Sequence, residues 1–322
     1  MKRSLVIVTV LAIGISALVW SNRDSIAVLL APRKKAATSR SEAAINADNF
    51  FWQIFHDAEY EKIQPALEVL TAAYLQTPSD AKTAAHIGWL HLWRMSERAR
   101  LNSVPATSTD DVVMVRKYFA EAVTLDPSDA RYLGFLAASI LAEGAIHKDE
   151  KLTRKGYFML RDSIEAWPEF NLFTASYVMS QQPADSPRFR EGLDWVWRNL
   201  DVCAQEKIDR VNPDYSKYMS SETKDGQKRV CWNSWIAPHN FEGFFLNMGD
   251  MLVKMGDWQT AQKIYANAKL SREYGSWKFQ AILEERMKQA QSNVAIFNAS
   301  NETSKARIMV DSEFSCMACH QR

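Results

Sequence analysis

The segment 244–270, FFLNMGDMLVKMGDWQTAQKIYANAKL, carries two apolar stripes at helical spacing with a glycine between them. Residues three and four apart share one face of a helix, so the spacing predicts two amphipathic helices joined by a tight turn at Gly256. The predicted faces consist of Phe245, Met248, Gly249 and Leu252 on the first helix, and of Ala261, Tyr265 and Ala268 on the second.

The composition extends this prediction to the rest of the chain. Eleven tryptophans and only eleven glycines among 322 residues suit long packed helices better than a turn-rich sheet. The predicted fold class is therefore all-α. A net charge of +1 argues against nucleic acid as a partner, because such partners select strongly basic surfaces.

The helix pair at 244–270 resembles the tetratricopeptide repeat, in which small residues let two antiparallel helices approach closely. Weaker copies of its second helix occur at ALEVLTAAYLQTPSD and YFAEAVTLDPSDA, which end in Pro78 and Pro127. Glu273 stands where the last repeat would have proline, and the spacing is irregular. The resemblance implies a helical-hairpin solenoid over 47–290, with a concave surface for a protein partner.

Residues 203–240 depart from this pattern. They are polar and contain turn signals at 212–213 and 225–226, which predicts a long excursion from the helical stack. Cys203 and Cys231 flank most of it. They either form a disulfide, worth about 3.5 kcal/mol in the chain-entropy account, or remain reduced core thiols.

The amino-terminal part, residues 1–31, has the layout of a signal peptide or signal anchor. Lys2 and Arg3 precede an unbroken apolar run over 5–20. An uncleaved transmembrane anchor is favoured, because no small-x-small cleavage site follows the run. Positive charges lie on both sides of it and leave its orientation open. Residues 32–46 are polar and are expected to be a tether.

The tail, residues 291–322, contains the clearest chemical signal. Cys316, Cys319 and His320 spell C-x-x-C-H, the attachment signature of c-type haem. Two thiols on one local turn can add to the two haem vinyl groups while the adjacent imidazole reaches the iron. These residues alone resemble the c-type cytochromes. The resemblance implies one covalent haem c, held through thioethers, with His320 as the proximal iron ligand.

A second iron ligand is not evident. Only two residues follow the motif in this sequence, so the distal ligand is expected from upstream, from another molecule, or not at all. His239, in the excursion, is the first candidate, and Met309 is the nearest methionine outside the motif. The four other histidines outside the motif are possible ligands too, but each is expected to be an ordinary surface or core residue: His56, His86, His91 and His147.

Other uses of a C-x-x-C pair remain open at this point. The cysteines would serve equally as a disulfide or a redox pair. Zinc is the weakest alternative, because a structural site needs four ligands and the chain has no second C-x-x-C. A thiol–disulfide oxidoreductase would place the pair at a helix start after a strand, and the sequence shows no such context.

Together these features predict a periplasmic haem c protein on a helical-repeat scaffold, used in electron transfer or redox-linked docking. The resemblance to c-type cytochromes implies that haem attachment is completed outside the bacterial inner membrane, so the body would face the periplasm, or be secreted there if cleaved. The alternatives are an interaction scaffold with a terminal disulfide and no haem, and a haem sensor or enzyme with an open iron site. No HExxH, G-x-S-x-G or phosphate loop supports hydrolysis.

Overall fold

The computed structural model describes residues 20, 22–32, 34–103, 106–299 and 307–322. In this part of the chain, thirteen α-helices and six short 3-10 helices form the secondary structure, and no residue lies in a strand. The all-α prediction is confirmed. The chain divides into two compact units, residues 1–35 and residues 36–322, and the second unit is called the body below.

The first unit contributes one described helix, α2 (Arg23–Leu30), in which Val28, Leu29 and Leu30 are exposed. Across the described residues, no helix has both the length and the apolar character needed to cross a membrane. The predicted anchor run over 5–20 falls, except for its last residue, outside the described residues. The anchor therefore stays a prediction.

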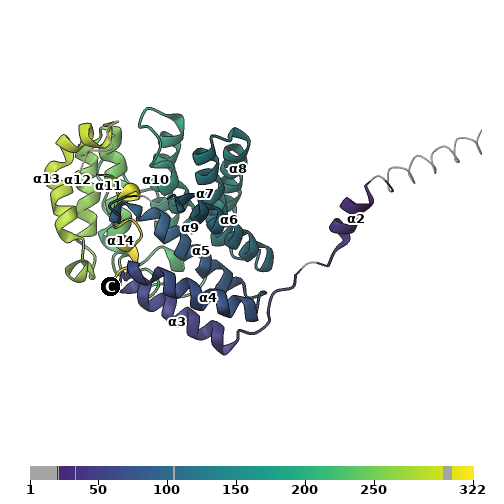
Figure 1. The fold of residues 1–322 in the computed structure, drawn as a ribbon. Coiled ribbons are helices and arrows are strands. Elements are labelled where there is room, and N and C mark those ends of the chain that lie inside the picture. Colours follow the sequence, from purple (N-terminus) through teal and green to yellow (C-terminus); the bar gives the residue numbers. More distant parts are fainter. Residues whose placement is uncertain (1–19, 21, 33, 104–105, 300–306) are drawn as a thin grey trace, which may run out of the picture. The chain divides into compact units, whose positions relative to one another are not determined.

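The helices of the body follow in chain order as α3 (Glu42–His56), α4 (Ile63–Gln76), α5 (Ala81–Ser96), α6 (Ser108–Leu125), α7 (Ala130–His147), α8 (Glu150–Ala166), α9 (Pro168–Met179), α10 (Pro187–Ala204), α11 (Asn240–Met255), α12 (Trp258–Ala268), α13 (Gln280–Phe297) and α14 (Met317–His320). Short 3-10 helices lie at Tyr60–Lys62, Arg98–Arg100, Ser216–Tyr218, Gln227–Val230, Tyr274–Ser276 and Met309–Asp311. Most helices pack against the next helix in the chain, and α13 packs on both α11 and α12 (Figure 1).

Several of these helices begin at a polar residue that fixes the first turn. In each case the side chain accepts a hydrogen bond from a backbone N–H two or three residues later, which satisfies a donor that the helix itself leaves unpaired. The capping residues are Ser41, Asp80, Asp129, Asp149, Ser186 and Asp257. The sequence thus sets these helix starts locally.

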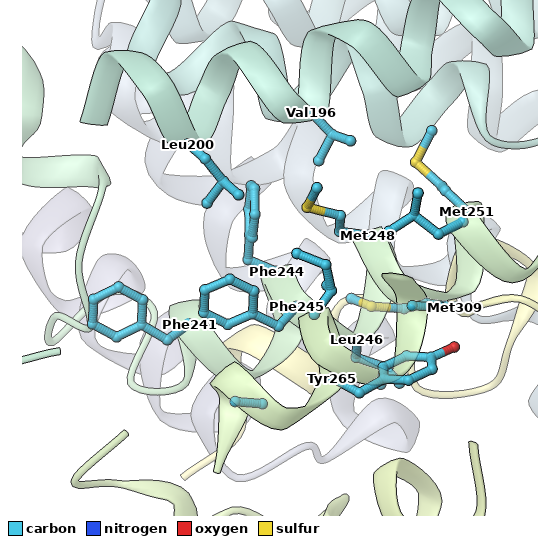
Figure 2. Close-up of a cluster of buried hydrophobic side chains, with 14 of the residues drawn as sticks. Val196, Leu200, Phe241, Phe244, Phe245, Leu246, Met248, Met251, Tyr265 and Met309 are labelled. Atoms are coloured by element: carbon cyan, nitrogen blue, oxygen red, sulfur yellow. The ribbon is translucent and has the colours of Figure 1, made fainter. Parts of the chain in front are cut away.

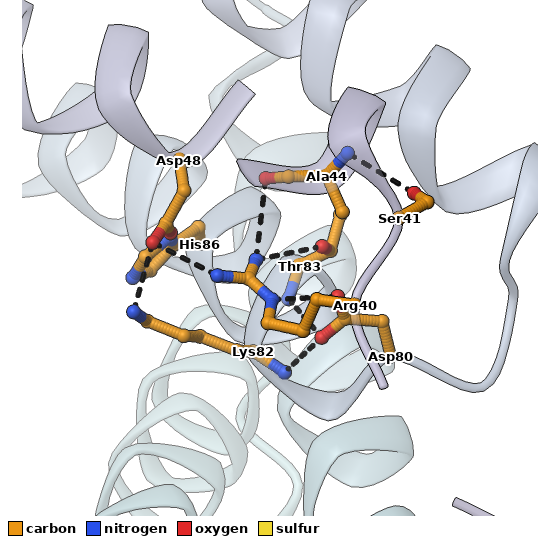
Figure 3. Close-up of polar contacts among 8 residues, drawn as sticks. All are labelled: Arg40, Ser41, Ala44, Asp48, Asp80, Lys82, Thr83 and His86. Atoms are coloured by element: carbon orange, nitrogen blue, oxygen red, sulfur yellow. Dashed lines mark hydrogen bonds and ion pairs between the residues drawn. The ribbon is translucent and has the colours of Figure 1, made fainter. Parts of the chain in front are cut away.

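A charged cluster attaches the chain before α3 to the body (Figure 3). The Arg40 guanidinium donates to Asp80 at 2.9 Å and to Asp48 at 3.0 Å, and Asp48 also pairs with Lys82 and His86. Asp48 and Asp80 are buried, so losing Arg40 would leave buried carboxylates with fewer partners. The tether predicted over 32–46 is therefore too long, because residues from Arg40 onward belong to the folded body.

The excursion predicted at 203–240 lies between α10 and α11, with only two 3-10 turns inside it. Cys203 and Cys231 are both buried and are joined in a disulfide, with their Cα atoms 5.6 Å apart. The bond closes the loop at its base, where Tyr215 and Trp232 also enter the hydrophobic core. The excursion is thus packed onto the body at several points.

Helix α11 forms the centre of the largest hydrophobic cluster (Figure 2). Every residue from Phe241 to Lys254 is buried, so the helix is enclosed on all faces. Its neighbours in the cluster include Val196 and Leu200 of α10 and Tyr265 of α12. A helix with no solvent-facing side needs covering segments all round, and the tail provides one of them.

The tail differs from the prediction at both of its ends. Helix α13 continues through Phe297, so the first residues of the tail predicted at 291–322 are helical. After the undescribed residues 300–306, the chain returns to the core, where Met309 is 1% exposed. Its backbone N–H donates to the Asp250 carboxylate at 2.8 Å. The tail is therefore part of the folded body.

The contact between α11 and α12 yields a stability prediction. A Cβ added at Gly249 would lie 2.1 Å from Cε1 of Tyr265, whose hydroxyl donates to Asp250 at 2.7 Å and so cannot move freely. Gly249→Ala should lower the free energy of unfolding by about 2 kcal/mol, although alanine normally favours a helix. Urea unfolding followed by circular dichroism measures this change.

Gly275→Ala is the matched control, because a Cβ there meets no atom within 4 Å. It should leave the free energy of unfolding nearly unchanged. Equal stability of the two variants would show that the α11–α12 contact is looser than the structure has it.

Candidate haem-attachment site

The C-x-x-C-H residues occupy a single helical turn. Cys316 is the N-cap of α14, and Cys319 and His320 are its last two residues. The turn lies between two groups of helices (Figure 1). Met317 packs in the hydrophobic cluster of α3 to α7, whereas Ala318 and Cys319 pack in the cluster around α11. The motif therefore connects the two main cores of the body.

Glu97 caps this turn from the end of α5. Its Oε1 atom accepts the backbone N–H groups of Cys316 at 2.9 Å and Met317 at 3.0 Å. Its Oε2 atom accepts from Trp93 at 2.9 Å and from Arg100 at 2.8 Å. The carboxylate is fully buried and has four donors, which is the arrangement that a buried acceptor requires.

Three further backbone contacts hold the turn. The Trp277 indole donates to the Ala318 carbonyl at 2.8 Å, and the His239 N–H donates to the Cys319 carbonyl at 3.0 Å. Beyond the motif, the backbone N–H of Arg322 donates to the carbonyl of His56 at 3.0 Å. Segments far apart in sequence thus fix both sides of α14.

The His320 imidazole is oriented as a metal-binding histidine would be. Its Nδ1 atom lies 2.8 Å from the Ile236 carbonyl oxygen, so Nδ1 carries the proton and Nε2 is left with its lone pair. The described residues offer Nε2 no hydrogen bond. Burial lowers the pKa of His320 to about 4, which keeps the ring neutral near pH 7. The rings of Phe55 and Trp89 lie 4.9 and 5.8 Å from it.

The two thiols have unequal surroundings. Cys316 is half-buried, whereas Cys319 is 6% exposed and lies against α11. A Cβ at Gly243 would come 2.2 Å from the Cys319 sulfur, so only glycine fits there. Burial raises the pKa of Cys316 well above its usual value and that of Cys319 to about 12. Both cysteines are therefore neutral thiols in this packing.

A buried tyrosine hydroxyl lies beside the motif. It belongs to Tyr177 of α9, and the Ser315 and Cys316 side chains are its neighbours. Burial raises the pKa of this hydroxyl well above the usual value, and a hydrogen bond with the Ser315 side chain acts in the opposite direction. The feature that makes the motif compatible with haem is the oriented imidazole of His320.

Two hollows among the described residues lie beside the motif rather than over it. One, of about 240 Å³, is lined by α3, Trp235 and Arg322; the other, of about 60 Å³, adjoins the disulfide. Neither is lined by Cys316, Cys319 or His320. Cys319 also packs closely against Gly243, where an added Cβ would meet its sulfur. This close packing is the feature of the site that least suits a bound haem.

The two distal-ligand candidates are both buried. Met309 packs beside Tyr265 and Leu246 in the core (Figure 2). His239 is buried, with Nδ1 3.4 Å from Glu242, and its backbone follows Ile236, which lies on the Nδ1 side of His320. Within the described residues neither candidate makes a ring or hydrogen-bond contact with His320. The identity of a distal ligand stays a prediction.

The remaining histidines have ordinary surroundings. His86 pairs with Asp48, His91 lies 2.8 Å from Asp111, and His147 is exposed. His56 is closer to the site, because its Nε2 lies 3.3 Å from the same Ile236 carbonyl that His320 contacts. In the part of the chain that the structure describes, no three His, Cys, Asp or Glu side chains gather as ligands of a metal ion.

Sequence reasoning missed Glu97, the Ile236 carbonyl and Tyr177. None of them belongs to a motif, and each reaches the site from more than eighty residues away in sequence. Comparison with family models, with curated proteins and with solved structures finds no match in any of the three. The site is therefore interpreted from its own geometry.

The Glu97 cap predicts a local effect on the motif. Glu97→Gln keeps the size of the side chain but replaces one acceptor oxygen by an amide nitrogen, so two buried donors lose their partner. The free energy of unfolding should fall by about 2 kcal/mol. In haem-free chain, Cys316 and Cys319 should also react faster with a thiol reagent, because the turn is released.

The exposed residue Glu285 provides the control for this substitution. Glu285→Gln should change neither stability nor thiol reactivity. A Glu97→Gln protein whose thiols stay as protected as before would contradict the capping role.

The lowered pKa of His320 predicts a pH dependence of the haem-free chain. The unfolded chain takes up a proton near pH 6.5, whereas the folded chain resists it down to about pH 4. Stability should therefore be full above pH 6.5 and decline as the pH falls toward 4. The decline should be smaller in His320→Gln, and comparison of the two proteins removes the contributions of His56 and His86. Identical pH profiles would show that His320 is not held neutral by folding.

Proposed function

We propose that this chain carries one haem c, bound through thioethers to Cys316 and Cys319, with His320 as the proximal iron ligand. The observation that carries the proposal is the motif in one helical turn, with the imidazole held by the Ile236 carbonyl and Nε2 unpaired. A bound haem would supply a one-electron redox centre. Electron transfer or redox-linked docking to a protein partner is the function that follows.

The chain's own residues would do three things for the haem. Ile236 would fix the ring orientation and the tautomer of His320, as a second-shell acceptor does for metal-bound histidines. Glu97 would hold the turn that carries both thiols. The surrounding rings, which include Phe55 and Trp89, would exclude water from the centre.

We further propose that the scaffold is a tetratricopeptide-like stack of helical hairpins. Support comes from consecutive helices that pack on each other and from small residues at their contacts. Gly249 touches Tyr265, and Gly88 lies against the Phe119 ring, where an added Cβ would come within 3.0 Å. A partner protein would bind the concave face of such a stack.

The proposed location is the bacterial inner membrane, with the body in the periplasm. The apolar run over 5–20 would be the anchor, or a signal peptide if it is cleaved. The Cys203–Cys231 disulfide supports an oxidising compartment, since such bonds are rare in the cytoplasm of mesophiles.

Two rival functions each have an observation in their favour. A haem-free interaction scaffold would explain why Cys319 is packed so tightly against Gly243. A haem sensor or enzyme with an open iron site would explain why His239 and Met309 do not contact the His320 ring. Haem attachment is preferred to the scaffold because the scaffold does not account for the orientation of His320 by the Ile236 carbonyl. Between the two haem proteins, carbon monoxide binding to the reduced protein decides, since only an open iron site takes it up promptly.

A count of thiols separates the haem protein from the scaffold. Thioether bonds survive denaturation and reduction, so protein matured with the cytochrome c machinery should then expose two thiols, those of Cys203 and Cys231. A scaffold with a second disulfide would expose all four cysteines of the chain. The pyridine haemochrome spectrum of the same sample should show one haem per chain.

Cys316→Ala with Cys319→Ala is the matching variant. It should abolish haem staining on a denaturing gel and leave the helical circular dichroism nearly unchanged, because the helices of the body pack without these sulfurs. Four thiols and no stain in the unmutated, matured protein would contradict haem attachment.

A further inference from the structure

The acceptor that orients His320 lies on an exposed turn. Ile236 and Trp235 are both exposed, in an irregular stretch just before α11. The turn is closed on itself, because the Ser234 N–H donates to the Ala237 carbonyl at 3.0 Å and the Ala237 N–H donates to the Ser234 hydroxyl at 3.2 Å. Exposed loops are the more mobile parts of a fold. The Ile236 carbonyl therefore needs a contact with the body to keep its direction.

His56 supplies this contact from the end of α3. Its Nε2 atom lies 3.3 Å from the Ile236 carbonyl oxygen, which can only accept, so Nε2 carries the proton. A backbone carbonyl has two lone pairs and can accept from His56 Nε2 and His320 Nδ1 together. The histidine clamp, defined as His56, the Ile236 carbonyl and His320, thus joins α3, the turn and the motif.

The packing around His56 fixes the donor side of the clamp. The residue is buried, and its ring lies 5.2 Å from the Trp52 ring and 5.1 Å from the Trp235 ring. Its own carbonyl accepts the Arg322 N–H at 3.0 Å. Burial lowers the pKa of His56, so near pH 7 the ring is neutral and its single N–H is the one that Ile236 receives.

Side-chain packing alone does not hold the turn. The hollow of about 240 Å³ is lined by the end of α3 and by Trp235, so the turn is not closely packed on α3 throughout. Contacts between rings also leave the direction of a neighbouring carbonyl free, whereas a hydrogen bond is directional. The bond from His56 is therefore the contact that aims the Ile236 carbonyl.

We propose that His56 is a positioning residue, which keeps the Ile236 carbonyl aimed at Nδ1 of His320 by donating a hydrogen bond to it. The consequence for iron rests on the proposed function. An acceptor aligned on Nδ1 raises the basicity of the imidazole at Nε2, and hydrogen bonding around the ligands tunes the potential of a haem. Loss of the clamp should therefore raise the reduction potential.

The test pairs His56→Leu with His56→Gln in the full chain. Both variants lose the imidazole and its contacts with Trp52 and Trp235, but only glutamine places an N–H near the position of Nε2. In the haem-free chain, proton–nitrogen NMR measures the Nδ1 proton of His320, whose signal is assigned by its loss in His320→Gln. This signal should move upfield in His56→Leu, because its hydrogen bond weakens, and stay near its original position in His56→Gln.

The matured protein gives a second measurement. At a fixed applied potential near the midpoint, the ratio of reduced to oxidised haem should rise about threefold in His56→Leu, because one hydrogen bond of the clamp is lost. The ratio should change little in His56→Gln. His147→Leu is the control at an exposed histidine and should alter neither measurement.

A third measurement needs no variant at position 56. In the unmutated haem-free chain, the Nε2 proton of His56 should exchange slowly with solvent, because it is buried and bonded to Ile236. Rapid exchange of this proton would contradict the clamp even if His56→Leu did not fold.

The remaining outcomes separate the clamp from the haem. An unmoved His320 signal in His56→Leu, or an equal displacement in both variants, would reject the positioning role of His56. A pyridine haemochrome spectrum without covalent haem would reject the proposed function and the predicted change in potential. The spectra of the haem-free chain would still decide the clamp in that case.

Discussion

The enclosure of α11 is the constraint on which the rest of the body depends. A helix buried on every face has to find a partner for each of its polar side chains. Asp250, the clearest case, receives the Tyr265 hydroxyl at 2.7 Å, the Met309 N–H at 2.8 Å and the Arg286 guanidinium at 3.3 Å. These donors come from α12, the tail and α13. The Asp250 carboxylate thus holds three segments of the chain against α11.

The same enclosure places the C-x-x-C-H motif. Where α11 begins, Gly243 leaves room for the Cys319 sulfur, and the loop before it supplies the Ile236 carbonyl to His320. From the opposite side, Glu97 of α5 holds the start of the turn. Orientation of the imidazole therefore follows from packing between two cores.

The sequence predicted those features of the fold that depend on interactions between residues close together in the chain. The helix pair at 244–270, the excursion before it and the C-x-x-C-H turn all depend on residues close together in the chain. The extent of the tether and the docking of the tail were mispredicted, because they depend on distant partners. Arg40 is polar in sequence yet binds two buried carboxylates, and Met309 follows a polar stretch yet lies in the core. Composition cannot reveal such contacts.

If haem is bound as proposed, the burial of the two thiols also determines the sequence of haem attachment and folding of the tail. Cys319 is 6% exposed against α11, and both thiols have raised pKa values in this packing. Thioether formation needs access to both sulfurs, so haem would be attached before the tail docks between the two cores. Docking would then bring the attached haem to the junction of the two cores, and the hydrogen bonds to Glu97, Trp277 and His239 would hold the docked tail in place. Attachment and folding of the tail are then successive steps that the same few residues control.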